Sequence, residues 1–247
     1  MMNRKNMKKF GAVVLAAGLA LSVSGCSGKT EDSVKTIQES GVFKVAIVDS
    51  DNYYTSLQGD QPVGMEAELI ETISAALGVT TEYQVMSRSA AMEAVTAGTA
   101  DVAIGCIDSS GSAAENYLLT TSYGKGFYYV VTEKGDYAQS AGAFANSVIG
   151  VNSGLGDGVR TQLYVAEGIT INEYADAESA AKEIKDGRIR GYVCGEEDAK
   201  ALLSDPKLQV QNLFDVDPAE YVIVAGAEDR TLVNGMNTLI AQFLEKE

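Results

Sequence analysis

The chain has 247 residues, with 34 Asp and Glu against 19 Lys and Arg and no His, which gives a formal net charge of −15. The absence of His excludes Ser-His-Asp and Cys-His nucleophiles, His general bases and the common His-containing zinc sites. The excess of acid argues against a nucleic-acid partner, because duplex binding depends on clustered Lys and Arg that neutralise phosphates. This composition fits a protein that binds and releases rather than reacts, and we expect no catalytic residue, no metal and no cofactor.

The first 25 residues have the order of basic and apolar residues that is typical of a secretory signal peptide. The apolar run at 10–23 is too short for a membrane span of about 20 residues. It ends at Ser24-Gly25-Cys26, which resembles a bacterial lipobox, where the Cys is acylated, for example with palmitate, and becomes the mature N-terminus. We expect a signal peptide at 1–25, a lipidated Cys26 and a tether through residue 32; the alternative is an ordinary signal with an incidental Cys. Removing the signal takes the net charge from −15 to −19.

From residue 33 onward, amphipathic stretches alternate with apolar runs rich in β-branched and aromatic residues, which predicts alternating helices and strands. The clearest helix is at 65–77, where apolar residues recur at a spacing of four and Gly78 provides a stop. In the first half, we expect strands at 42–48, 81–85, 101–106 and 127–131 and helices at 65–77 and 90–97. In the second half, we expect strands at 147–151, 169–174, 190–194 and 221–225 and helices at 159–166, 177–185 and 231–244.

Alternating strands and helices predict an α/β fold of mostly parallel sheets with helices on both faces. Two such sets, at 42–106 and 147–194, predict two lobes. Ligands of such sheets bind beyond the carboxyl ends of the strands, which between two lobes means a cleft. Cys106 and Cys194 lie at strand ends; they could pair in an exported protein, but apolar-flanked cysteines are more often simple buried thiols.

Five blocks of the sequence carry a family resemblance when they are taken in series: SVKTIQESGVFKVAIVDSD, VGMEAELIETISAALGV, AVTAGTADVAIG, the pair Ser122-Tyr123, and GRIRGYV. In this order and spacing they resemble the extracytoplasmic solute-binding proteins of ABC importers, in the two-lobed type 2 periplasmic-binding-protein fold and its amino-acid-binding branch. The resemblance implies lobe one at 33–123 plus 221–247 and lobe two at 126–219. Two crossing segments near 123–126 and 219–221 would form the hinge about which the lobes close on the ligand.

The resemblance also implies a grip on a zwitterion, and this chain departs from it. Members of the branch hold the α-carboxylate with an Arg after a lobe-one strand and the α-ammonium with an Asp after a lobe-two strand. The corresponding positions here are Ala113 and Gly195, although Glu196 and Glu197 follow Gly195 directly. No basic residue lies near Ala113 in the sequence, which slightly favours a ligand without a free carboxylate.

Polar and aromatic residues at the ends of the expected strands are the remaining candidates for ligand contact. Tyrosine faces and acids suit an amine through cation–π and ionic contacts, and the loop at 153–156 precedes a helix whose N-terminal amides could take an anion. Each candidate has a structural alternative: the tyrosines as surface-loop residues, Arg88 as a solvent-facing side chain, and Asp108 as a cap of the following turn. The expected ligand-binding residues are Tyr53, Tyr54, Arg88, Asp108, Ser110, Ser153, Gly154 and Glu196.

These features favour a lipid-anchored, extracytoplasmic receptor that captures a small polar solute, an amino acid or related amine, and delivers it to an ABC permease. We expect it to be a monomer. One alternative is a sensory or interaction lipoprotein with a degenerate cleft. Another is an enzyme on the same fold, similar to cyclohexadienyl dehydratase, with Glu196, Glu197 or Asp108 as its acids; the missing carboxylate-binding Arg and the absence of His count against it.

Overall fold

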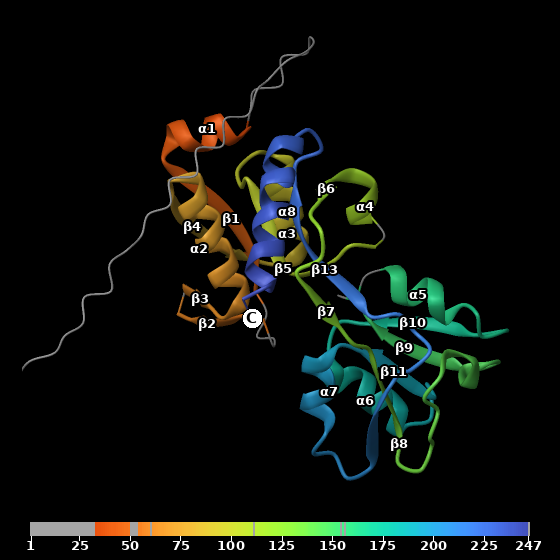
Figure 1. The fold of residues 1–247 in the computed structure, drawn as a ribbon. Helices are drawn as coiled ribbons and strands as arrows, with labels where there is room; N and C mark the ends of the chain where they lie inside the picture. Colours follow the sequence, from red (N-terminus) through yellow and green to blue (C-terminus); the bar gives the residue numbers. More distant parts are fainter. Residues whose placement is uncertain are drawn as a thin grey trace, which may run out of the picture. The chain divides into compact units, whose positions relative to one another are not determined.

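The computed structural model describes residues 33–49, 54–59, 61–110, 112–153, 155 and 157–246. These residues form two α/β lobes, each built on one sheet (Figure 1). Within them, no helix has the length and the hydropathy that crossing a membrane requires. The expectations for the signal peptide, the tether, Cys26, Tyr53 and Gly154 fall outside the described residues.

Lobe one is built on a six-stranded sheet with the order β4-β1-β5-β13-β6, in which β7 also pairs with β13. Strands β1, β4 and β5 are mutually parallel, whereas β13 is antiparallel to β5, β6 and β7. Strands β2 and β3 form a separate hairpin. The strands are β1 Val42–Val48, β2 Ser56–Gln58, β3 Gln61–Val63, β4 Thr80–Met86, β5 Val102–Asp108, β6 Leu118–Leu119, β7 Gly124–Gly126 and β13 Ala219–Ala225.

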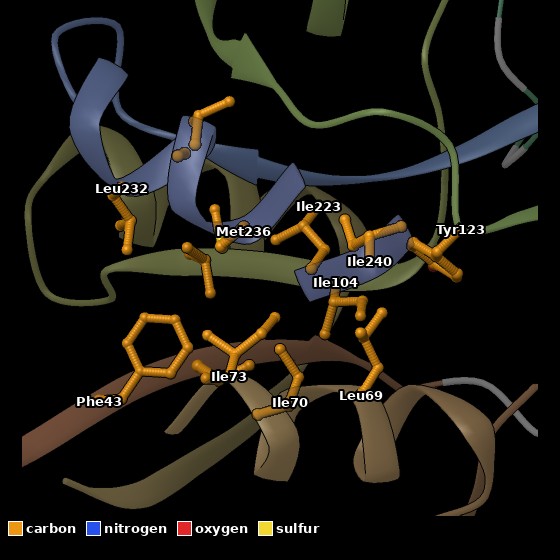
Figure 2. Packing of buried hydrophobic residues seen from close by; sticks show 14 of the residues in the cluster. Phe43, Leu69, Ile70, Ile73, Ile104, Tyr123, Ile223, Leu232, Met236 and Ile240 are labelled. Atoms are coloured by element: carbon orange, nitrogen blue, oxygen red, sulfur yellow. The ribbon is translucent and has the colours of Figure 1, made fainter. Parts of the chain in front are cut away.

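Helices cover both faces of this sheet, because both sets of alternating side chains in its strands are apolar. In β1, Phe43, Val45 and Ile47 join one core with side chains of α1, α2 and α8, while Ala46 and Val48 join a second core with side chains of α3. Figure 2 shows the first core, where side chains of α2 and α8 meet those of the strands. The helices of this lobe are α1 Ser33–Ser40, α2 Met65–Leu77, α3 Arg88–Thr96, α4 Ser112–Asn116 and α8 Arg230–Leu244.

Lobe two is built on a five-stranded sheet with the order β10-β9-β11-β8-β12. Strands β9, β10 and β11 are parallel, and β8 is antiparallel to β11 and β12. One core packs against η1 and α5 and a second against α6 and α7. The elements are β8 Tyr129–Glu133, η1 Ala141–Phe144, β9 Val148–Asn152, α5 Asp157–Leu163, β10 Thr170–Tyr174, α6 Ala177–Lys185, β11 Gly191–Cys194, α7 Glu196–Leu202 and β12 Leu208–Asn212.

The two-lobed α/β fold with mostly parallel sheets is confirmed, and each sheet contains one strand that runs against the others. Strand β13 runs antiparallel in lobe one and β8 runs antiparallel in lobe two. Neither strand follows a helical crossover within its own sheet: β8 enters lobe two directly from β7, and β13 returns from lobe two to lobe one. The two segments where the chain passes between the lobes pair with each other, with Gly126 opposite Ala219 and Gly124 opposite Tyr221.

Candidate ligand-binding site

The sequence-predicted residues of lobe one lie at the carboxyl ends of its parallel strands. Tyr54 follows β1, Arg88 follows β4, and Asp108 is the last residue of β5. Parallel strands end at the same edge of a sheet, and ligands of α/β folds bind beyond that edge. The chain also crosses to lobe two here, because Tyr221 near the start of β13 pairs with Asp108. This edge is the candidate site.

The end of β5 carries an irregularity that redirects its backbone. Gly105 has a φ of 131° and Cys106 a φ of 49°, and the pairing with β13 shifts register nearby. A Cβ on Gly105 would lie 2.6 Å from Cβ of Val48, so only glycine fits there. The Cys106 amide donates to a Glu66 carboxylate oxygen at 2.8 Å, and its carbonyl accepts from Nη2 of Arg88 at 3.1 Å. The backbone amide and carbonyl of Cys106 are therefore both hydrogen-bonded to charged side chains.

Glu66 is a fully buried carboxylate that the sequence analysis missed. It accepts hydrogen bonds from the Thr55 hydroxyl at 2.5 Å, from the Cys106 amide at 2.8 Å and from the Tyr123 hydroxyl. A buried carboxylate needs such donors because it has lost its contacts with water. One signal was present in the sequence: Glu66 lies one helical turn before Ile70, on the face that packs into the core. Glu66 therefore links the loop after β1, the end of β5 and the residue before β7.

Arg88 is the first residue of α3, where the Ser87 hydroxyl caps the helix by accepting from the Ala90 amide at 3.4 Å. Its half-buried guanidinium lies against the end of β5, through the bond to the Cys106 carbonyl. Burial and then the Glu66 charge raise the pKa of the Cys106 thiol, and the charge of Arg88 partly offsets them. Within the described residues, Arg88 forms no ion pair with a carboxylate.

Asp108 and Ser110 make hydrogen bonds to residues of lobe two. Asp108 is 8% exposed; its Oδ1 accepts from the Ser110 amide at 3.0 Å and its Oδ2 from the Tyr128 hydroxyl at 3.2 Å. Asp108 thus caps the following turn, as its structural alternative predicts, and also binds the segment that leads into β8. Burial, followed by the Asp108 charge, raises the pKa of Tyr128 and keeps its hydroxyl a donor. The Ser110 hydroxyl accepts from the Gly158 amide of α5 at 3.0 Å.

Tyr54 lies against β7, the first crossing strand. Its hydroxyl donates to the Lys125 carbonyl at 2.9 Å and accepts from the Lys125 amide at 3.0 Å. A Cβ on Gly124 would lie 2.8 Å from the Tyr54 ring, so the absence of a side chain at 124 makes room for it. The ring meets Tyr221 edge-on, with the centroids 5.6 Å apart. Tyr54 therefore holds β7 in place, and the expectation that its ring also contacts a ligand stays a prediction.

The side chain of Tyr221 lies against Gly126, at the other end of β7 from Gly124. A Cβ on Gly126 would lie 1.7 Å from the Tyr221 hydroxyl oxygen, so this position also has to lack a side chain. Burial is the main cause of the raised pKa of Tyr221. The two glycines of β7 thus accommodate two tyrosine rings, one from the segment between β1 and β2 and one from β13.

The acids at the start of α7 differ in their surroundings. Glu196 is the first residue of α7; its side chain is 43% exposed and pairs with Lys200 at 2.8 Å. Asp198, which the sequence analysis did not single out, accepts from the Tyr192 hydroxyl at 2.5 Å and from Nδ2 of Asn152 at 2.6 Å. Asp198 therefore closes a polar network within lobe two, whereas Glu196 remains partly open to solvent.

The two positions where the resemblance implies charged anchors carry no charge. Ala113 is buried in α4, and Gly195 is the N-cap of α7. Ser153, which follows β9, is exposed, and its amide donates to the Tyr174 carbonyl at 2.9 Å. Any charged grip on a ligand must therefore come from other residues.

The remaining chemistry of the described residues is limited. Cys106 and Cys194 are free thiols rather than a disulfide, with Cys194 buried and Cys106 half-buried. No cluster of three or more Cys, Asp or Glu side chains in the described ranges is arranged to hold a metal ion. A surface pocket between α6 and α7 contains none of the expected site residues. The edge described above offers a guanidinium, hydroxyls and carboxylates, which suit hydrogen bonds to a small polar molecule.

Two sheets joined by paired crossing strands, with polar side chains at the carboxyl edge beside the crossing, define a two-lobed solute-binding fold. Residues 43–246 match the family described as bacterial extracellular solute-binding proteins, family 3. The chain belongs to this family. A search of the curated proteins returned no match.

Solved structures share this fold at low sequence identity. An amino-acid ABC transporter substrate-binding protein from Streptococcus pneumoniae, bound to L-arginine, has a TM-score of 0.67 and 21% identity, over 86% of this chain and 92% of that one. The arginine-bound ArgBP from T. maritima, truncated to its residues 20–233, has a TM-score of 0.64 and 18% identity, over 84% and 99%. The ancestral amino-acid-binding protein AncCDT-1, a precursor of cyclohexadienyl dehydratase, has a TM-score of 0.68 and 15% identity, over 87% and 94%.

Proposed function

We propose that this protein is the substrate-binding component of an ABC importer and that it captures an amino acid or a related amine between its lobes. The observation that carries the proposal is the meeting of both lobes at the carboxyl edge of lobe one. There the Tyr128 hydroxyl donates to Asp108, and the Gly158 amide donates to Ser110. A solute that binds at this point touches both lobes, and it stabilises the arrangement in which they are together.

The lobe boundaries belong to this proposal. We place lobe one at 33–123 plus 221–247, lobe two at 126–219, and the hinge in the two crossing segments. The short strand β7, with glycines at 124 and 126, supports a hinge there, because glycine adapts to changes in backbone angles at little cost. Closure of the lobes on the solute, followed by delivery to a permease, is the working cycle.

The proposed contacts come from both lobes. Arg88, Asp108 and Ser110 lie at the carboxyl edge of lobe one. Ser153 and Glu196 follow strands β9 and β11 of lobe two. The remaining proposed contacts are Tyr53, Tyr54 and Gly154.

We further propose that the protein is anchored outside the cytoplasm as a lipoprotein. The charge and apolar order of residues 1–25 and the Ser24-Gly25-Cys26 motif support this, as does the polar tether that follows. A lipid-anchored monomer at the membrane surface would deliver its solute to permease subunits nearby. Cells labelled with a fatty-acid analogue should yield a labelled protein, and Cys26→Ser should abolish the label; a label that survives this substitution contradicts the anchor.

A thermal-shift screen of amino acids, amines and small peptides tests the binding function. A solute at about one hundred times its Kd stabilises the folded protein by about 2.7 kcal/mol. In a chain of this length, that raises Tm by about 5 to 10 °C. A screen in which no solute raises Tm contradicts the proposal and favours a sensory or interaction lipoprotein with a degenerate cleft.

We propose binding without turnover. The carboxylates of Glu66 and Asp108 at the site accept hydrogen bonds from protein donors, which does not favour a role as proton donors to a substrate. Purified protein should therefore leave prephenate and arogenate unchanged. Conversion of either compound would support the dehydratase-like alternative.

A further inference from the structure

Arg88 is the one basic residue between Lys44 and Lys125, in a stretch that contains eleven acidic residues. Despite this, it forms no ion pair within the described part of the chain. Its half-buried guanidinium makes one hydrogen bond, from Nη2 to the Cys106 carbonyl at 3.1 Å. A guanidinium has five N–H donors in a planar fork, so most of its hydrogen-bonding capacity is uncommitted among these residues.

Two buried carboxylates of the same edge already accept hydrogen bonds from other residues. Glu66 accepts from Thr55, Cys106 and Tyr123, and Asp108 accepts from Ser110 and Tyr128. A cation that is partly withdrawn from water is stabilised when an anion meets it. No described residue supplies that anion to Arg88 by direct contact.

The position of Arg88 matches the need for a carboxylate grip. The family resemblance implies an Arg shortly after β5, where this chain has the buried Ala113 of α4. Arg88 reaches the end of the same strand from a different element, the first turn of α3. Its Nη2 contacts the carbonyl of Cys106, two residues before Asp108, which binds the lobe-two residue Tyr128.

We propose that Arg88 is the specificity-determining residue of the site and that it holds the carboxylate of the solute. This inference rests on the proposed binding function and deepens it: the solute is an α-amino acid with a free carboxylate rather than an amine that lacks one. The Ala at position 113 slightly favours a ligand without a free carboxylate, and this inference replaces that expectation. The guanidinium fork, rather than its charge alone, would set the preference, because the fork matches two carboxylate oxygens.

The test compares acids with their neutral derivatives. Calorimetric titrations of the mature protein would use α-amino acids, including L-arginine, L-lysine and L-glutamine, each beside its α-carboxamide. We expect the wild-type protein to bind the acid at least about tenfold more tightly than the carboxamide. Arg88→Met should weaken binding of the acid about 10- to 100-fold and remove the preference for it. Arg88→Lys should retain part of the affinity but lose most of the preference.

Two controls separate this inference from folding and from the binding function itself. Arg230→Met removes the same charge from an exposed residue at the start of α8. Arg230 follows the end of β13 that lies away from the crossing, so this variant should keep the preference for the acid. Circular dichroism and Tm should show that Arg88→Met and Arg88→Lys are folded. Two results would overturn this inference but leave the binding function standing. In the first, the wild-type protein binds the carboxamides as tightly as the acids. In the second, an Arg88→Met or Arg88→Lys variant keeps the full preference for the acids. Wild-type protein that binds no solute in the panel removes the proposed function and this inference with it.

Discussion

Asp198 at the carboxyl edge of lobe two and Arg88 at the carboxyl edge of lobe one differ in how many hydrogen-bond partners they have. In lobe two, Asp198 accepts from Tyr192 and Asn152, so the network closes on itself. In lobe one, Arg88 has only the Cys106 carbonyl as its partner among the described residues. A closed network holds its own shape, whereas a cation without a counter-ion gains most from an external anion. We propose from this difference that Arg88 of lobe one provides the main charge that recognises the solute and that lobe two closes on it.

Both edges contain buried groups that ionise only at high pH, and alkaline pH should produce the largest effect. Burial raises the pKa of Tyr123 in lobe one and of Cys194 in lobe two well above their ordinary values of 10.0 and 9.0. The unfolded chain therefore loses these protons first as pH rises. The stability that they contribute is fully present below about pH 9 and is lost above it.

For these two groups together, we expect the free energy of unfolding to fall by about 4 kcal/mol between pH 8 and pH 11. Urea unfolding at pH 7, 9, 10 and 11 measures this. The variant Cys194→Ala is less stable at pH 7, but on going to pH 11 it should lose about 3 kcal/mol less than the wild-type protein, because it lacks the buried thiol. A free energy of unfolding that stays constant up to pH 11 contradicts the assignment.

The second largest effect should come from Glu66, which ties three segments of the lobe-one edge together. Glu66→Leu leaves the Thr55 hydroxyl, the Cys106 amide and the Tyr123 hydroxyl without their acceptor, and should lower the free energy of unfolding by about 3 kcal/mol. Glu68→Leu is the matched control, because Glu68 lies in the same first turn of α2 but is exposed. It should change stability by less than about 0.5 kcal/mol. Equal effects in urea unfolding would show that the buried network is unimportant.

A smaller effect is expected from Tyr54, which holds the crossing strand. Tyr54→Phe removes both hydrogen bonds to Lys125 but keeps the ring over Gly124, and should lower the free energy of unfolding by about 1 kcal/mol. Tyr164→Phe, at a 62% exposed position, serves as the control and should be neutral. If Tyr54→Phe leaves stability unchanged and only weakens solute binding, then its hydroxyl acts on the solute and not on β7.

The smallest effect on stability is expected from Glu196 in lobe two. Its exposed pair with Lys200 contributes little, so Glu196→Gln should change the free energy of unfolding by less than about 0.5 kcal/mol. If lobe one provides the main charged contact, this variant should also weaken binding of an α-amino acid less than Arg88→Met does. Calorimetry on the two variants measures both losses of affinity. A larger loss in Glu196→Gln than in Arg88→Met would show that lobe two makes the main charged contact with the solute.

Much of the fold could be predicted from local sequence signals. The bounds of β1 and α2 were predicted to the residue, because β1 is a continuous apolar run and α2 combines a four-residue apolar spacing with the left-handed cap at Gly78. Short strands such as β6 and β7 were missed. They contain two and three residues, and they exist because β13 offers a partner far away in the sequence.

The site could be predicted in part. Arg88 and Asp108 were predicted as contacts because they lie at the ends of expected strands, where α/β proteins bind their ligands, and the structure places both at the carboxyl edge of lobe one. Glu66 and Asp198 were missed because an acid in the first turn of a helix reads as an ordinary surface residue that favours the helix dipole. The role of Tyr54 was hidden as well, since its partner Lys125 is 71 residues away. Long-range hydrogen bonds leave no periodic trace in a sequence.

The most direct test of the account is a crystal structure of the mature protein with the amino acid that gives the largest thermal shift. We predict that the solute lies at the carboxyl edge of lobe one, with its carboxylate oxygens on the Arg88 guanidinium and with residues of lobe two on its other side. A solute bound elsewhere, for example in the pocket between α6 and α7, would contradict the account, as would a carboxylate held by any group other than Arg88.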